Sequence, residues 1–165
     1  MRLLHYINES SINGEIIIKK PSKCTKDEIN TFYDLVREAG HAFPSLNDIK
    51  KKAFLLGFYY LGNEIIAISS LKIPYRIDDV FDEAGVDSTG YKYEMGWSYT
   101  IPEYQAKGIM FDLNMALLNK VQGKVFATVR VNNEPSIKGL IKKGFVKVGN
   151  EWQGMVTKLA LYVRK

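Results

Sequence analysis

The sequence is poor in the residues that hold secreted and metal-dependent proteins together. It has one cysteine, Cys24, so no disulfide can form within the chain. It has only two histidines, and no cysteine and histidine cluster shows the spacing of a metal site. We therefore predict a reducing, cytoplasmic setting and no bound metal.

Long hydrophobic runs are also missing. The longest apolar stretch, residues 54–61, is far shorter than a helix needs to cross a membrane. The apolar segment at the start is too short for a secretory signal, because polar residues follow at Asn8 and Glu9. These features predict neither a secretory leader nor a membrane partner.

Runs of five or more like charges are absent, although the formal net charge is +5. A basic surface suits an anionic partner, either a nucleic acid or a phosphate-bearing cofactor. Nucleic-acid binding has little support, because aromatic and basic residues do not interleave in a recognition motif. We interpret Lys50–Lys52 and Lys142-Lys143 as solvated helix ends. A length of 165 residues predicts one domain, 1–165.

Hydrophobic periodicity predicts a mixed sheet with helices. A capping box at Thr25 and Glu28 opens a helix that ends at Gly40. The acidic stretch 75–92 is predicted to be a loop with at most one helical turn. The strand-helix-strand unit from Tyr93 to Val131 must be parallel, while the hairpins are antiparallel. The predicted strands are 15–19, 53–61, 64–73, 93–101, 124–131, 145–148 and 156–164, and the predicted helices are 25–40, 45–52, 109–121 and 133–144.

The most informative stretch, residues 93–110, reads YEMGWSYTIPEYQAKGIM and leads from a strand through a turn into a helix. Unpaired N–H groups and the dipole at a helix N-terminus can bind phosphate. Lys107 adds a positive charge there, and Gly108 permits close approach of a ligand. The alternative is a plain strand-to-helix turn. Strict alternation predicts Tyr93, Met95, Trp97, Tyr99 and Ile101 on one face of the strand, and Glu94, Gly96, Ser98 and Thr100 on the other.

This stretch resembles the signature of the GNAT superfamily of acyl-CoA N-acyltransferases, through Pro102-Glu103-Tyr104-Gln105-Ala106-Lys107-Gly108-Ile109-Met110. Asn133-Glu134-Pro135-Ser136-Ile137, followed by Lys142-Lys143-Gly144-Phe145, resembles a second family signature, Asn-x-x-Ala-Ile with Lys-x-Gly-Phe. With the element order, the resemblance covers nearly the whole chain. It implies a GNAT-like mixed α/β fold: a mostly antiparallel sheet of about seven strands with a central parallel pair, flanked by about four helices.

The resemblance also implies acetyl-CoA (coenzyme A) as a co-substrate. Amides of residues 105–110 would hold its pyrophosphate, and the backbone of residues 98–100 would bind the pantetheine arm at a splay between two parallel strands. Asn133 would contact the same arm, and a strand amide near Tyr99 would polarise the acyl carbonyl. The implied coenzyme-binding residues are Ser98, Tyr99, Thr100, Gln105, Ala106, Lys107, Gly108, Ile109, Met110 and Asn133.

Three positions depart from the family pattern. Met110 stands where the family prefers glycine or alanine, and its side chain would either crowd the phosphates or point into the core. Leu140 stands where many members carry a tyrosine that protonates the departing thiolate, so that acid is absent or comes from elsewhere. Gln105 replaces the commoner arginine.

Glu94 is the candidate catalytic residue. An attacking amine must lose a proton, and Glu94 lies on the strand that leads to the phosphate turn, where related enzymes of the histone type place a catalytic glutamate. We predict it on the face that carries Ser98. The alternative is a structural carboxylate paired with a lysine or an arginine. Cys24, despite preceding a helix N-terminus, is predicted to be a bystander.

Together these features predict an N-acetyltransferase that moves an acetyl group from acetyl-CoA to a primary amine by direct attack. The alternative is a degenerate, non-catalytic acyl-CoA-binding or interaction module of the same fold. The acceptor is open between a small molecule and a peptide, and the acidic stretch 75–92 could attract a cationic amine. A homodimer is possible, since dimers are frequent in the family.

Overall fold

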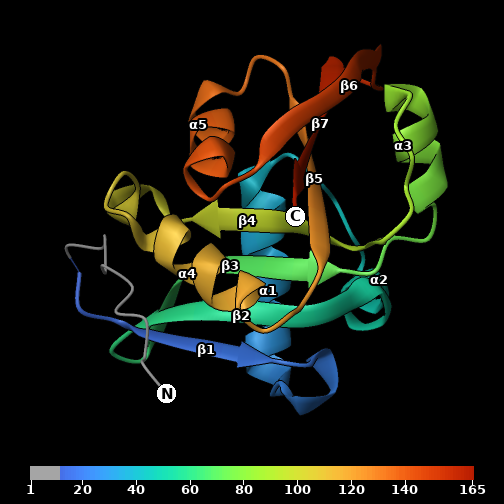
Figure 1. Ribbon diagram of the computed structural model, residues 1–165. Helices are drawn as coiled ribbons and strands as arrows, with labels where there is room; N and C mark the ends of the chain where they lie inside the picture. The colour runs from blue at the N-terminus through green and yellow to red at the C-terminus, as the bar shows by residue number, and fades with distance from the viewer. Residues whose placement is uncertain (1–11) are drawn as a thin grey trace.

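The computed structural model describes residues 12–165, so the start of the chain, on which the prediction about a secretory signal rests, lies outside the described part. Its centre is a seven-stranded sheet in the order β1-β2-β3-β4-β5-β7-β6 (Figure 1). All neighbouring strands are antiparallel except β4 and β5, which confirms the predicted central parallel pair. The strands are β1 (Glu15–Lys19), β2 (Ala53–Leu61), β3 (Glu64–Lys72), β4 (Tyr91–Thr100), β5 (Lys124–Arg130), β6 (Val146–Gln153) and β7 (Lys158–Arg164).

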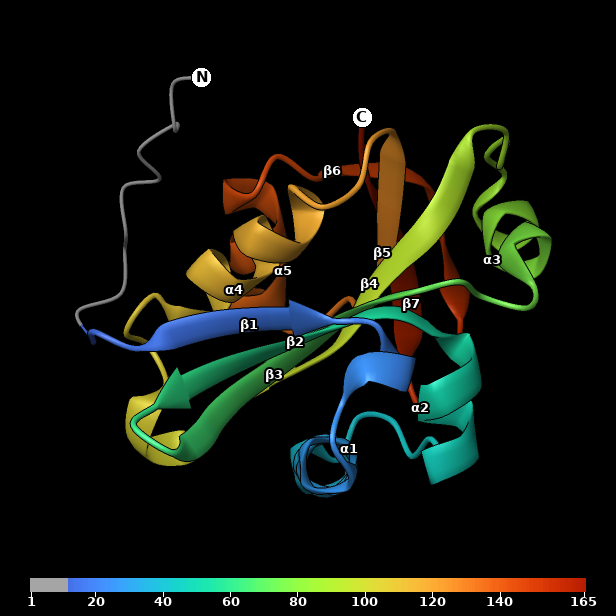
Figure 2. The same cartoon turned by 90° about the horizontal axis from the view of Figure 1, so that it is seen from below.

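Helices cover both faces of the sheet. Figure 2 shows α1 and α2 on one side and α4 and α5 on the other, while α3 packs against β6 and β7. No helix in residues 12–165 is long and apolar enough to cross a membrane. The helices are α1 (Lys26–Ala39), α2 (Leu46–Lys52), α3 (Ile77–Ala84), α4 (Ile109–Leu118) and α5 (Glu134–Lys142), with 3-10 turns η1 (Pro21–Lys23) and η2 (Pro102–Tyr104).

The predicted start and end of α1 are confirmed. The Thr25 hydroxyl accepts from the Glu28 amide at 3.1 Å, and the Glu28 carboxylate accepts from the Thr25 amide at 2.9 Å. These bonds satisfy two of the amides that a helix start leaves unpaired. Gly40 ends the helix in the left-handed conformation, with φ +73°.

The prediction of a loop over residues 75–92 is wrong for α3. Phe81 and Ala84, one turn apart, are fully buried against Phe126 of β5 and Leu161 of β7. Burial of this narrow apolar stripe stabilises a helix whose other residues are mostly acidic. Residues 12–165 therefore contain five helices where about four were predicted, and the additional helix covers the β5–β7 end of the sheet.

A bulge interrupts β4 and reverses its alternation. The β3–β4 register gains one residue on β4 around Trp97, whose φ is +51°. Before the bulge, Met95 packs in the cluster that contains Leu117 of α4. After it, Tyr99 packs in the cluster around Phe32 of α1. The prediction that all these apolar residues of β4 share one face is therefore wrong, because an extra residue exchanges the two faces.

The contact between β6 and α3 yields a stability prediction. Gly149 has φ +67°, and a Cβ there would collide with the carbonyl oxygen of Ala84. Gly123 has φ +97°, but a Cβ there would meet nothing within 4 Å. Both alanine substitutions carry backbone strain of about 1–2 kcal/mol. We expect Gly149→Ala to lower the free energy of unfolding by about 2 kcal/mol more than Gly123→Ala, as measured by urea denaturation. Equal losses would contradict this close approach.

Candidate functional site

The two parallel strands β4 and β5 separate to form a fork. Their last paired residues are Glu94 and Phe126, although β4 continues to Thr100 and β5 to Arg130. Figure 1 shows the strands diverging beyond this point, with α5 in the angle between them. The fork is the predicted splay. It leaves backbone groups of a central strand without a strand partner, and such groups need a ligand or water.

The ladder between β3 and β4 determines which backbone groups face the fork. The Ile101 amide donates to the Ile66 carbonyl at 3.0 Å, on the β3 side. Because successive residues of a strand turn their backbone groups to opposite neighbours, the backbone of Thr100 faces the fork and that of Tyr99 faces β3. The predicted oxyanion donor is a strand amide near Tyr99. Because the Tyr99 amide faces β3, the nearest amide that faces the fork is that of Thr100.

Ser98 marks the open side of the same strand. It is exposed although β4 is the central strand of the sheet. Its hydroxyl lies 2.7 Å from that of Ser69 on β3. Ile68, the neighbour of Ser69, packs in the α1 cluster, so Ser69 and Ser98 lie on the α4 and α5 side. Ser98 is therefore the solvent-exposed polar residue of β4 on the α4 and α5 side.

The turn between β4 and α4 presents unpaired amides. Ala106 has φ +59° and Gly108 has φ +80°, so the chain curls before α4 begins. Within residues 12–165, no backbone hydrogen bond is donated by the amides of 106–108, and the first amides of a helix have no partner within it. The amide of Gln105 is already used, donating to the Pro102 carbonyl at 3.3 Å. The amides without a backbone partner are therefore those of 106–110, one residue fewer than the range that the resemblance implies.

The Gln105 side chain connects the turn to the fork. Its Nε2 donates to the Thr100 carbonyl at 2.8 Å, which ties the end of β4 to the residue that precedes the free amides. Lys107 is exposed beside them and adds a full positive charge to the helix dipole. The turn and the end of β4 therefore form one structural unit that suits a phosphate group.

Two departures from the family pattern have clear positions. Met110 is half-buried and packs against the cluster that contains Tyr59 and Leu113, so its side chain points toward the core. Leu140 is 8% exposed and belongs to the core cluster beneath α5, where it supplies no proton. Asn133 caps α5 by accepting from the Ser136 amide at 3.4 Å, which leaves its side-chain NH₂ group available for a ligand.

Glu94 lies at the point where the fork opens and is paired with a lysine. Lys72 Nζ lies 3.3 Å from Glu94 Oε2, and the Thr128 hydroxyl donates to Glu94 Oε1 at 3.5 Å. The ammonium of Lys72 also lies 5.0 Å from the ring centroid of Trp97. The prediction that Glu94 and Ser98 share a face is wrong, because the bulge separates them. Lys72 has no local signal in the sequence, because its position opposite Glu94 depends on the β3–β4 register.

Helix α1 reaches the same end of β4. The Tyr99 hydroxyl donates to Glu38 Oε1 at 3.1 Å, and burial, together with this bond, raises the pKa of Tyr99.

On the other side of the sheet, Lys143 is 7% exposed, which corrects its interpretation as a solvated helix end. Burial lowers the pKa of Lys143 to about 8. A lysine at a helix C-terminus is favoured by the dipole, which partly offsets its desolvation.

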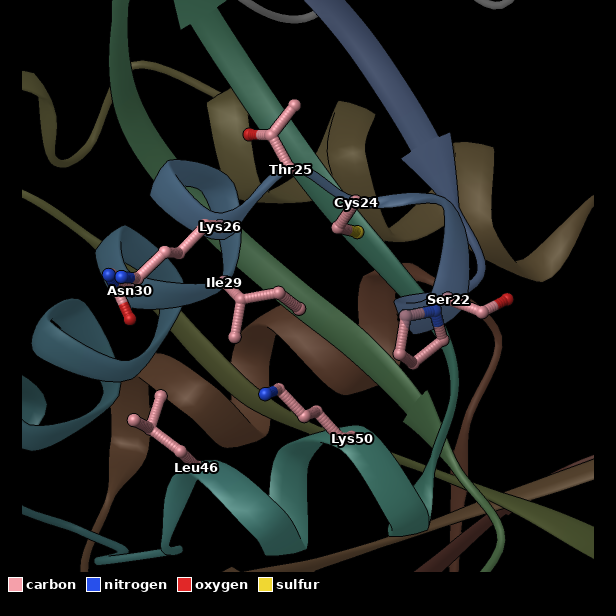
Figure 3. Close-up of a pocket in the computed structure, with 9 residues that line it drawn as sticks. Ser22, Cys24, Thr25, Lys26, Ile29, Asn30, Leu46 and Lys50 are labelled. Atoms are coloured by element: carbon pink, nitrogen blue, oxygen red, sulfur yellow. The ribbon is translucent and has the colours of Figure 1, made fainter.

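A cavity of about 470 Å³ lies away from the fork, between η1, the start of α1 and α2. Figure 3 shows the Lys50 side chain extending from α2 toward Ile29 of α1. None of the implied coenzyme-binding residues lines it. Cys24 does, and burial raises the pKa of its thiol to about 11, so the thiol is neutral and a poor nucleophile. Among residues 12–165, no three His, Cys, Asp or Glu side chains are grouped as a metal site.

Solved structures share this fold. An acyl-CoA N-acyltransferase from Pseudomonas aeruginosa superposes with a TM-score of 0.70 at 12% identity, over 93% of this chain and 100% of that one. A GNAT-family acetyltransferase from Streptococcus agalactiae gives 0.68 at 12% identity, over 93% and 97%. Naa50 from Arabidopsis thaliana, in complex with the bisubstrate analogue CoA-Ac-MVNAL, gives 0.69 at 12% identity, over 91% and 98%.

The sequence itself matches no protein-family model and no curated protein. At such low identity the likeness shows the fold alone. The chain therefore has the GNAT fold, as the sequence motifs implied, and the chemistry must be argued from its own residues.

The pKa of Cys24 generates a prediction about its reactivity. A thiol with a pKa of about 11 is about one-thousandth thiolate at pH 8, against roughly a quarter for an unperturbed cysteine. We expect alkylation by iodoacetamide at pH 8 to be at least a hundredfold slower than for free cysteine, with a rate that still rises above pH 9. A rate that levels off by pH 8.5 in the folded protein would contradict the shift.

Proposed function

We propose that this protein is an N-acetyltransferase that transfers an acetyl group from acetyl-CoA to a primary amine by direct attack. The observation that carries the proposal is the row of unpaired amides at 106–110, positioned at the end of a fork between parallel strands in a GNAT fold. A diphosphate at this turn is favoured by the amides, by the dipole of α4 and by Lys107. The Met110 side chain points toward the core.

The fork has the groups that an extended amide-containing arm needs. The backbone of Thr100 faces the open side, and Asn133 has a free side-chain NH₂ group at the start of α5. An arm lying along β4 would complete the hydrogen bonds that the departing β5 leaves unmade. The same backbone amides can polarise a thioester carbonyl and stabilise its oxyanion.

Glu94 serves as the general base, directly or through water. The amine nitrogen forms a bond to the thioester carbon, the carbon–sulfur bond breaks, and the ammonium proton passes to the Glu94 carboxylate. The coenzyme thiolate then takes a proton from water, since Leu140 has none to give. Glu94 lies at the fork, where the acetyl group would be exposed to an amine from the α1 side.

The acceptor is a small-molecule or peptide amine. One protein of the same fold, NAA60 from Arabidopsis thaliana, was solved in complex with a bisubstrate analogue. The bisubstrate analogue bound to Naa50 is CoA-Ac-MVNAL, in which MVNAL is a peptide sequence. A peptide amine is therefore compatible with this fold. We place the reaction in the cytoplasm, as the single cysteine suggests.

A non-catalytic acyl-CoA-binding module is the second candidate. Two observations favour it: Leu140 is buried where many members of the family carry an acid, and Glu94 is already engaged by Lys72. Such a module would bind acetyl-CoA with the same turn and release no thiol in the presence of any amine. Thiol release across a panel of primary amines therefore separates the two functions.

The phosphate turn can be tested through its lysine. Lys107 precedes α4, and Lys120, also exposed, follows its other end. We expect Lys107→Ala to weaken acetyl-CoA binding about three- to fivefold at low salt, since an exposed charge pair contributes up to about 1 kcal/mol. Lys120→Ala should leave the dissociation constant unchanged. Isothermal titration calorimetry measures both, and equal effects of the two variants would place the phosphates elsewhere.

The role of Glu94 can be tested against a matched ion pair. Glu151 is paired with Lys147 at 2.6 Å on the exposed strand β6. We expect Glu94→Gln to lower kcat about a hundredfold, the usual order for a general base, with an unchanged dissociation constant for acetyl-CoA. Glu151→Gln should keep full activity. Wild-type turnover in Glu94→Gln over the whole pH range would remove Glu94 from the mechanism.

A further inference from the structure

Two side chains at the fork form the surroundings that a primary ammonium prefers. Glu94 provides a carboxylate at 3.3 Å from the Lys72 ammonium, and Trp97 provides an aromatic face at 5.0 Å. A carboxylate gives a charge-assisted hydrogen bond, and an indole attracts a cation through its ring electrons. The group that these two residues hold in the structure is the protein's own lysine.

The backbone of β4 brings the carboxylate and the indole together. Residues 94 and 97 are three positions apart, so regular alternation would place them on opposite faces. The bulge, with Trp97 at φ +51°, turns both toward Lys72. A positive φ is rare for a bulky residue, and such strain persists where the surrounding structure enforces it, often at functional sites.

Gly96 leaves the space that the lysine chain occupies. A Cβ at this position would lie 3.0 Å from Lys72 Cε and 3.1 Å from Nζ, closer than ordinary contacts. The site therefore receives an unbranched methylene chain that ends in an ammonium group. The side chains of Lys72 and Glu94 keep 17% and 16% of their exposure, so solvent still reaches the pair.

We propose that Glu94 and Trp97 form the binding site for the primary alkylammonium of the acceptor, and that Lys72 occupies this site as an internal competitor until the acceptor displaces it. The proposal rests on the proposed function for the role of the ligand as acceptor, while the ammonium site itself can be tested without any acetyl transfer. It names the acceptor as an amine on an unbranched chain, the chemistry of a lysine side chain or a polyamine.

Competition lowers the apparent affinity for the acceptor by the fraction of time that the site is free. If Lys72 fills the site about nine-tenths of the time, its removal strengthens binding about tenfold. Lys72→Met keeps the length of the chain and removes the charge, while Lys72→Arg keeps the charge. A lysine with a purely structural role would show the opposite trend, because its loss would weaken binding and turnover.

The binding test uses Trp97 as the reporter. Trp152→Phe leaves Trp97 as the only tryptophan, since the chain has two. In this background we titrate n-butylammonium chloride at constant ionic strength and follow the fluorescence, with butan-1-ol and butyrate as neutral and anionic controls. We expect Lys72→Met to lower the dissociation constant for n-butylammonium about tenfold, and a further Glu94→Gln change to abolish saturable binding.

Lys147→Met is the matched control, because Lys147 also pairs with a glutamate, at 2.6 Å, but on β6. It should leave n-butylammonium binding unchanged. If Lys72→Met does not fold, the same titration is carried out with Lys72→Gln, which also removes the charge. Equal binding of n-butylammonium by the parent and by a folded Lys72 variant would overturn the proposal.

Activity separates this inference from the proposed function. With cationic amines as acceptors, Lys72→Met should lower KM about tenfold, whereas Lys72→Arg should not. Acetylation of amines with an unchanged KM in Lys72→Met would overturn the competitor and leave the acetyltransferase in place. Tenfold tighter n-butylammonium binding without acetylation of any amine would support the ammonium site while the proposed function fails.

Discussion

The arrangement of β4 between its two neighbours is the constraint on which the rest of this site depends. On one edge β4 carries an extra residue relative to β3, and on the other it separates from β5 after Glu94. The bulge exchanges the faces of the strand, and the separation leaves backbone groups unpaired. Both irregularities fall within a few residues, so backbone groups without a strand partner, a carboxylate and an indole lie close together along one strand of the sheet.

The same strand links this point to the anion-binding turn. Gln105 holds the Thr100 carbonyl, and the chain then curls through Ala106 and Gly108 into α4. Because α4 packs on the sheet through Leu113 and Leu117, its N-terminal amides are fixed relative to the fork. A ligand that reaches from the turn to the fork would therefore meet a preformed surface. Preformed amides can bind phosphate without the cost of ordering a loop.

Local patterns were sufficient to predict most of the fold. The capping box at Thr25, the hairpin turn at 62–63 and the strand-helix-strand unit all rest on neighbours in sequence, and each is present. The failures have a common cause. Helix α3 is stabilised by burial of Phe81 against β5 and β7, and Lys143 is buried at the end of α5. Neither burial has a local signal in the sequence.

The sequence by itself determined the element order, the Gly-containing turn before α4 and the GNAT resemblance, because periodicity and turn chemistry are properties of adjacent residues. Only the tertiary structure decided that Met110 packs inward and that Lys72 lies against Glu94. The position of Lys72 depends on the register between β3 and β4, and a shift of one residue would send its side chain to the other face.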